Sequence, residues 1–111
     1  MAEDDTSAAL SREILVQTAD VRVQIVTLAP GEAVPWHVHS TVTDRIVAIV
    51  GDLAIETAAP PTRHRLAPGQ RLAIPPGAAH RVAGADGNPC QFLNVHSGGA
   101  YDFRPVPRGG P

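Results

Sequence analysis

The sequence has little of what thiol chemistry and nucleic-acid binding require. Its single cysteine, Cys90, excludes an intrachain disulfide and an all-thiolate metal site, and we expect it to be a buried or half-buried strand residue. All nine basic residues are arginines, and they are scattered along the chain without forming a run. Binding to a phosphate backbone requires a basic stripe, so we expect no nucleic-acid partner.

Long apolar segments are also missing. The longest apolar runs, such as residues 46–50, fall far short of the roughly 20 residues that a membrane span needs. The first five residues, MAEDD, are acidic, whereas a secretory signal begins with basic residues. We therefore expect a soluble, cytoplasmic protein without a membrane partner.

The composition that remains is ordinary for a folded protein, with 43% apolar and 18% charged residues and a formal net charge of −2. A chain of 111 residues is one domain's length. We expect a single domain over residues 1–111 whose core covers about residues 13–103. The ends, residues 1–5 and 104–111, are polar or rich in proline and glycine, so we expect them to be loose.

Proline and glycine interrupt the sequence at regular intervals, and the segments between them are rich in valine, isoleucine, leucine and threonine. Breaks roughly 8 to 12 residues apart are typical of an antiparallel sandwich or barrel. No segment after Asp20 has the length and periodicity of a helix, and at most a helical turn or two fits residues 6–13. The pattern predicts an all-β fold with nine short strands: residues 13–17, 21–28, 33–37, 45–50, 53–56, 63–66, 71–74, 80–83 and 91–96.

Two of these strands differ in their apolar pattern. In residues 21–25 valine and isoleucine alternate with Arg22 and Gln24, as in a strand with one dry and one wetter face. Residues 46–50 are apolar at both alternating positions and need cover on both faces. The outer cover must come from the N-terminal strand or from another subunit, and we expect a homodimer.

Three histidines lie where turns can bring them together. His37 and His39 are two residues apart, so their imidazoles leave an extended strand on the same face. Asp44 follows after a short gap that fits a tight turn returning the chain antiparallel, and His80 follows the rigid turn at residues 75–77. An isolated histidine pair is commonly two polar residues on an edge strand. Together with Asp44 and His80, the pair predicts a site for one divalent transition metal ion, namely Fe, Mn, Ni, Co, Cu or Zn.

The spacing of these residues resembles two motifs of the cupin family. The first motif is similar to a set of five residues here: Gly31, His37, His39, Asp44 and Gly51. The second is similar to a later set: Gly69, Pro75, Gly77 and His80. On these motifs the chain is identified as a small conserved-barrel cupin of the cupin 2 type. The resemblance implies a double-stranded β-helix, or jelly-roll barrel, with metal at its mouth and with His37, His39, residue 44 and His80 as ligands.

Two positions depart from the usual cupin pattern. Cupins usually carry Glu where this chain has Asp44, and Asn four residues past the last histidine, where this chain has Gly84. Asp is shorter by one methylene, or roughly 1.5 Å of reach. Asp44 could therefore bind the metal directly, bind it through water, or hydrogen-bond a ligating histidine. We expect direct ligation.

Residues after the second motif could extend the site. Asn94 and His96 share a parity, so an inward-facing strand would place a polar anchor and a possible general base beside the metal. The alternative is that this face points outward or that His96 is structural. Phe92 has the same parity and would then form an aromatic wall.

The remaining aromatic side chains are expected to serve the fold. Trp36 should leave its strand on the face opposite the histidines and pack in the core or at a dimer contact. His64, between two arginines, should be solvated. Tyr101 and Phe103 should pack a C-terminal segment onto the barrel, with Asp102 exposed between them.

An open metal site leaves positions for water, oxygen or a substrate. We therefore favour a metalloenzyme that acts on a small organic metabolite, with a dioxygenase as the leading reaction class and isomerase or lyase chemistry behind it. A narrow barrel suits a small molecule better than a polymer. The alternative is a non-catalytic module that senses or sequesters a small ligand or a metal, because one scaffold hosts many functions.

Overall fold

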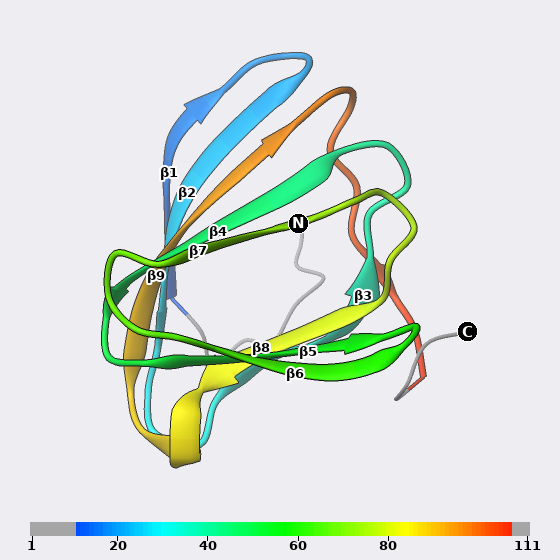
Figure 1. The fold of residues 1–111 in the computed structure, drawn as a ribbon. Coiled ribbons are helices and arrows are strands. Elements are labelled where there is room, and N and C mark those ends of the chain that lie inside the picture. The colour runs from blue at the N-terminus through cyan, green and yellow to red at the C-terminus, as the bar shows by residue number, and fades with distance from the viewer. Residues whose placement is uncertain (1–10, 108–111) are drawn as a thin grey trace.

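The computed structural model describes residues 11–107, which form two five-stranded antiparallel sheets facing each other (Figure 1). The first sheet has the order β1-β2-β9-β4-β7, and the second has the order β10-β3-β8-β5-β6. This arrangement is the predicted double-stranded β-helix. The elements are β1 (Ser11–Gln17), β2 (Val21–Leu28), β3 (Ala33–Val38), β4 (Thr43–Val50), β5 (Leu53–Ala58), β6 (Pro61–Leu66), β7 (Arg71–Ile74), β8 (His80–Gly84), the 3-10 helix η1 (Ala85–Gly87), β9 (Cys90–Ser97) and β10 (Arg104–Pro105).

The nine predicted strands are all present, and their ends lie within two residues of the predicted ones. The tenth strand, β10, was not predicted: Arg104 pairs with Val38 and Pro105 pairs with His37. The expectation of a loose segment is therefore wrong for residues 104–105. Residues 1–5 and 108–111 of the predicted loose ends lie outside the described residues, as do residues 6–10 of the possible helical turn; residues 11–13 belong to a strand. Between residues 11 and 107, no helix is long and apolar enough to cross a membrane.

The chain between His39 and Asp44 does not form a hairpin, which corrects the predicted antiparallel turn. β3 belongs to the second sheet and β4 to the first, so this short loop crosses from one sheet to the other. Val42, in the middle of the crossing, is buried. The crossing still brings Asp44 close to the histidines, but from the opposing sheet.

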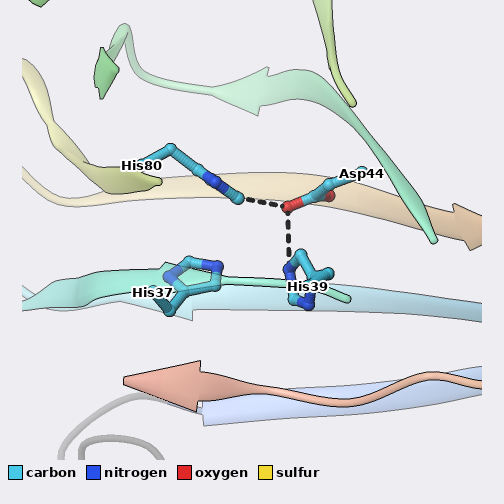
Figure 2. A group of neighbouring side chains, drawn as sticks. All are labelled: His37, His39, Asp44 and His80. Atoms are coloured by element: carbon cyan, nitrogen blue, oxygen red, sulfur yellow. Dashed lines mark hydrogen bonds and ion pairs between the residues drawn. The ribbon is translucent and has the colours of Figure 1, made fainter. Parts of the chain in front are cut away.

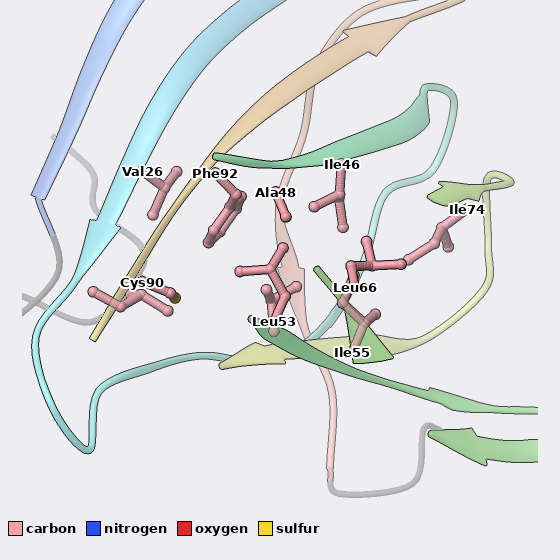
Figure 3. Packing of buried hydrophobic residues seen from close by; sticks show 11 residues of the cluster. Val26, Ile46, Ala48, Leu53, Ile55, Leu66, Ile74, Cys90 and Phe92 are labelled. Carbon is pink, nitrogen blue, oxygen red and sulfur yellow. The ribbon is translucent and has the colours of Figure 1, made fainter. Parts of the chain in front are cut away.

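The hydrophobic core lies between the two sheets, as Figure 3 shows. Ile46 and Phe92 of the first sheet meet Leu53 and Ile55 of the second, and none of the four is more than 1% exposed. Each such side chain contributes roughly 1.5–3 kcal/mol when it is removed from water. Cys90 is buried in the same cluster, and burial raises the pKa of its thiol to about 11.

The inner face of the first sheet is apolar at one end and polar at the other. On β2, Val26 and Leu28 enter the core, while Gln24 on the same face is only 5% exposed and lies farther along. The register places Gln24 beside Asn94 of β9, and His96 beside Asp44 of β4. Because alternate residues of a strand lie on the same face, the inward-facing side chains of the first sheet belong to the hydrophobic core at one end and to a buried polar cluster at the other.

Gly84, one of the two departures from the cupin pattern, has a steric explanation. It ends β8 just before η1, and a Cβ atom built at this position would lie 1.8 Å from the carbonyl oxygen of Asn88. No real Cβ atom tolerates that separation. The close backbone approach at this turn requires glycine and leaves no room for an asparagine.

The outer face of β4 is only partly covered. Ile46 and Ala48 are buried, whereas Ile49 and Val50 are 39% and 58% exposed. β1 pairs with β2 at the edge of the first sheet, and two strands, β2 and β9, separate it from β4. Residues 11–17 therefore do not supply the outer cover that this apolar segment was expected to need.

Candidate metal centre

Four buried side chains from three strands and one loop meet between the sheets. His37 on β3 and His80 on β8 are direct neighbours in the strand register, which brings together residues far apart in sequence. His39 follows β3, and Asp44 on β4 reaches across from the first sheet. None of the four is more than 2% exposed.

The potential ligand atoms of these four residues converge. One ligand atom from each lies within 4.8 Å of the others. The carboxylate oxygen Oδ2 of Asp44 is 2.9 Å from Nε2 of His80 and 3.4 Å from Nε2 of His39, as the dashed lines of Figure 2 mark. Two atoms that each bind one ion at about 2.1 Å lie no more than about 4.2 Å apart. Small side-chain shifts would therefore bring all four onto one ion.

Backbone carbonyls orient the three imidazoles. Nδ1 of His37 is 2.7 Å from the carbonyl of Pro35, and Nδ1 of His80 is 2.9 Å from the carbonyl of Ala78. Nδ1 of His39 is 2.6 Å from the carbonyl of Asp102, a residue from the far end of the chain. Because a carbonyl only accepts, each Nδ1 carries a proton that it donates, and Nε2 of each ring lies toward the centre.

The site combines opposing electrostatic effects. Burial and the neighbouring histidines lower the pKa of His37 to about 3. Burial also lowers the pKa of His39, but Asp44 outweighs it and leaves that pKa raised. Burial raises the pKa of Asp44, but interactions with His39, His80 and His96 outweigh it and hold the pKa well below its usual range. Asp44 is thus a carboxylate anion, and His37 is a neutral imidazole.

A carboxylate oxygen and the Nε2 atoms of two neutral imidazoles are all acceptors, so at these distances they repel unless a positive charge lies among them. Nε2 of His39 is buried and has no hydrogen-bond partner among residues 11–107. A proton on an imidazole or a metal ion would supply the missing charge. The chemistry of the donor set therefore fits a cation.

Asn94 and His96 both face inward and contact Asp44. Nδ2 of Asn94 donates to Oδ1 of Asp44 at 2.9 Å, and Nε2 of His96 lies 3.1 Å from the same oxygen. Oδ1 of Asn94 also accepts from Nε2 of Gln24 at 3.2 Å, so both ends of the Asn94 amide are engaged. Asn94 therefore holds Asp44 in place. Nδ1 of His96 is buried, and no residue in the described part of the chain forms a hydrogen bond with it.

Sequence reasoning missed Gln24 and Arg22. The side chain of Gln24 donates a hydrogen bond to Asn94, and its side-chain oxygen Oε1 accepts one from Arg22. The guanidinium of Arg22 lies over the ring of Tyr101, 4.3 Å from its centroid. The available signal was parity: both residues lie on the same face of β2 as the core residue Val26. The valine and isoleucine residues at the alternating positions of β2 are apolar, so the sequence alone does not indicate that the face with Arg22 and Gln24 points inward.

The pocket at the centre is small. It is lined by His37, His39, His96, Asp44, Asn94 and Phe92, and by Tyr101 and Phe103 of the C-terminal segment. Its free volume is about 20 Å³, close to what one water molecule needs. Phe92 thus forms the aromatic wall that an inward-facing strand would give.

The aromatic residues outside the cluster, together with His64 and Asp102, lie on the surface or pack onto the barrel. Trp36, on the face of β3 opposite the histidines, lines a surface groove beside β5 and β6, and His64 is half-buried on β6. Tyr101 and Phe103 pack onto the barrel, since the ring of Phe103 stacks on His37 at 4.4 Å. The expectation of an exposed Asp102 is wrong: its side chain is 31% exposed and accepts hydrogen bonds from Ser40.

Known structures resemble this fold along most of its length. A conserved protein with a double-stranded β-helix domain from Klebsiella pneumoniae is 22% identical, with 90% of this chain and 86% of that chain covered and a TM-score of 0.75. KdgF from Halomonas sp. is 19% identical, with 86% and 85% covered and a TM-score of 0.72. An oxalate oxidase is 17% identical, with 92% and 57% covered and a TM-score of 0.77. At these identities the likeness shows the fold alone.

Comparison with curated proteins gives no match. The sequence model of the cupin domain does match, over residues 24–96. This stretch contains both histidine motifs and most of the two sheets. The chain therefore belongs to the cupin family.

Proposed function

We propose that this cupin binds one divalent transition metal ion through Nε2 of His37, His39 and His80, with the carboxylate of Asp44 as the fourth ligand. One observation carries the proposal: buried atoms able to bind a metal converge from both sheets, with Oδ2 of Asp44 2.9–3.4 Å from the Nε2 atoms of His80 and His39. The backbone carbonyls already hold the three rings with Nε2 toward the centre. The ligand atoms of the three histidines are therefore oriented toward the position of a bound ion.

We further propose that the protein is a metalloenzyme acting on a small organic metabolite. Imidazole and carboxylate ligands suit Fe, Mn, Co, Ni, Cu or Zn, and a mixed set of this kind also serves non-haem iron oxygenases. A bound ion would supply Lewis-acid or oxygen-activating chemistry, so a dioxygenase-type reaction is favoured over an isomerase or lyase. The likeness to an oxalate oxidase is one of fold, and the ligand set is what supports an oxygen-dependent reaction.

His96 is the residue best placed to move a proton in such a reaction. Its Nε2 contacts Asp44, while its buried Nδ1 has no hydrogen-bond partner in the described structure and is left for a substrate. Asn94, with both ends of its amide engaged, acts by holding Asp44. In this proposal His96 is the acid or base, and Asn94 positions the carboxylate.

The second candidate is a non-catalytic module that senses or sequesters a small ligand or the metal itself. The observation that favours it is the pocket, whose free volume of about 20 Å³ is too small for a metabolite in the arrangement seen. Under either proposal we expect a single cytoplasmic domain that acts as a homodimer on a small molecule.

The experiment that tests the metal site is elemental analysis of protein purified without added metal. His37→Ala and His80→Ala should each abolish the bound metal, because each removes a ligand of a preorganised set. His64→Ala is the matched control, since His64 lies on β6 and outside the cluster. A full equivalent of metal in the His37→Ala variant would refute the site.

Activity then separates the two candidates. Anaerobic loading with Fe(II), followed by oxygen-uptake assays against diketones, thiols and phenolic acids, should show consumption that His37→Ala removes. Tight metal binding without consumption, together with a ligand-dependent rise in melting temperature, would favour the sensor.

A further inference from the structure

The C-terminal chain after β9 lies directly over the candidate metal centre. It leaves the first sheet at Ser97 and ends beside β3 in the second sheet, where Arg104 and Pro105 pair with Val38 and His37 (Figure 1). Val106 continues the attachment, since its amide donates to the carbonyl of Trp36 at 3.1 Å. We call residues 98–107 the strap.

The strap covers part of the pocket with two aromatic rings, Tyr101 and Phe103. The ring of Phe103 stacks on His37 at a centroid distance of 4.4 Å and an interplanar angle of 15°. The ring of Tyr101 lies 5.5 Å from His39 and 4.9 Å from His96. With both rings in place, the free space of about 20 Å³ admits about one water molecule and no organic ligand.

Asp102, between the two rings, fastens the middle of the strap, while the pairing of β10 with β3 holds its end. Its carboxylate accepts from the amide and the hydroxyl of Ser40 at 2.7 and 2.6 Å, and from Nε of Arg104 at 2.9 Å. Its backbone carbonyl also lies 2.6 Å from Nδ1 of His39. His37 and His80 are oriented by carbonyls two residues earlier in the chain, so His39 alone of the three depends on the strap.

The strap begins at a glycine pair that can act as a hinge. Gly98 has a φ of +108°, a conformation that L side chains rarely adopt. Gly99 lies against Thr41, where a Cβ atom would meet the Thr41 side chain at 2.2 Å. The chain can therefore turn sharply here and lie close to the crossing loop.

We propose that the strap opens about Gly98 and Gly99 to admit ligands and that Asp102 is its latch, so that opening also releases His39 from its orienting carbonyl. The inference deepens the proposed function, on which it rests, by naming how a ligand larger than water reaches the site. Asp102 is a positioning residue: it acts on the centre through the strap and through His39.

A cross-strand disulfide gives a direct test. Val38 and Arg104 are paired residues of antiparallel strands, and such pairs have Cα atoms about 4.5–5.5 Å apart, within the range of about 4.4–6.8 Å that a disulfide spans. Val38 lies between His37 and His39 on β3, so its side chain leaves on the other face. The Val38→Cys/Arg104→Cys variant locks the strap when oxidised and frees it when reduced. Cys90 is buried with a raised pKa and should not interfere.

The probe is diethyl pyrocarbonate, which acylates neutral imidazole, applied to metal-free protein at pH 7 and followed by peptide mass spectrometry. His37 lies beneath the ring of Phe103, so the reagent reaches its imidazole only when the strap moves away. We expect acylation of His37 to be at least about tenfold slower in the oxidised form than in the reduced form, because only the opened state exposes the ring. His64, outside the strap, should react at the same rate in both forms.

A second pair of variants tests the latch. Asp102→Ala should speed His37 acylation, whereas Asp52→Ala, which removes an exposed partner of Arg65, should leave it unchanged. Equal His37 rates in the oxidised and reduced forms, or an unchanged rate in Asp102→Ala, would overturn the proposal. Since the reagent acts on metal-free protein, this result is independent of the metal content that tests the proposed function.

Discussion

Asp44 is fully buried, and its two oxygens face different partners. Oδ2 lies toward His39 and His80, and Oδ1 toward Asn94 and His96. A buried carboxylate is costly unless charge and hydrogen bonds compensate it. In the metal-free protein, the hydrogen bond from Asn94 supplies part of that compensation, and a proton on His39, whose pKa Asp44 raises, supplies more of it below that pKa. A metal ion would compete with this proton for the space between Asp44 and the imidazoles.

The pH dependence of metal binding follows from this competition. The raised pKa of His39 means that its pairing with Asp44 stabilises the metal-free fold fully below pH 6.5, the ordinary histidine value. That stabilisation is lost as the pH rises through the raised pKa. We expect apparent metal affinity to keep rising with pH above 6.5 and binding to release protons. Calorimetric titrations with Zn²⁺ in two buffers of different ionisation enthalpy would measure the release, and equal heats in both buffers would contradict it.

Gly84 provides a prediction about stability at the same scale. In Gly84→Ala the new Cβ would lie 1.8 Å from the Asn88 carbonyl, so the turn must shift, at a cost of about 1–3 kcal/mol. For a chain of this size each kcal/mol lowers the melting temperature by roughly 4–8 °C. Gly69→Ala is the control, because a Cβ there meets nothing within 4 Å and only the left-handed backbone costs about 1 kcal/mol. Thermal unfolding curves would contradict the prediction if Gly84→Ala melted no lower than Gly69→Ala.

At the scale of elements, three adjacent strands carry one polar row across the first sheet. Gln24 on β2 donates to Asn94 on β9, and Asn94 donates to Asp44 on β4. Each amide orients the next, so the carboxylate is held from two strands away. The strand order β2-β9-β4 is what makes this chain of contacts possible.

Gln24→Ala should therefore destabilise the protein although no ligand is removed. It leaves the buried Oδ1 of Asn94 without its donor, which costs about 1–3 kcal/mol. Gln91→Ala on β9 is the matched control, because the hydrogen bond of Gln91 to Thr27 is exposed, and its loss should cost less than about 0.5 kcal/mol. Chemical denaturation would decide, and equal losses in the two variants would show that the polar row carries no stability.

The strands themselves were predictable, because β-branched segments between glycine and proline breaks specify them locally. What the sequence did not reveal depends on pairing between distant segments. β10 contains a proline and no apolar alternation, and it exists because its backbone meets β3. The inward direction of the Gln24 side chain was not predictable, because valine and isoleucine stand at the alternating positions of β2 and suggest that the other face of the strand is buried. The loop before Asp44 was long enough to suggest a hairpin, yet the partner strand lies in the other sheet.

The candidate site was predictable for a different reason. His37, His39, Asp44 and His80 were selected by motif spacing, and the structure brings all four together. The orientation of the rings was not predictable, because the carbonyl that fixes His39 belongs to Asp102 in the strap. Asp102 was expected to be exposed because nothing local to it signals a contact with Ser40, 62 residues away.

At the scale of the whole molecule, the two faces of the first sheet differ in what covers them. The inner face meets the second sheet, whereas Leu93 and its register neighbours Ile25 and Val47 form an apolar row on the outer face. Ile49 and Val50 extend this surface and are exposed. An apolar sheet face of this kind is typical of a contact between subunits.

We therefore expect the protein to be a homodimer in solution, with the outer face of the first sheet as its interface. Sedimentation equilibrium at micromolar concentration should give about twice the chain mass of 11.6 kDa. Leu93→Arg should give the monomer mass, because association would bury an unpaired charge at the centre of the contact. Thr62→Arg, on the exposed strand β6 of the other sheet, should remain dimeric. A wild-type protein at monomer mass would contradict the dimer, and a dimeric Leu93→Arg variant would show that the interface lies elsewhere. The candidate metal centre should be unaffected by Leu93→Arg, because it lies on the inner side of the same sheet.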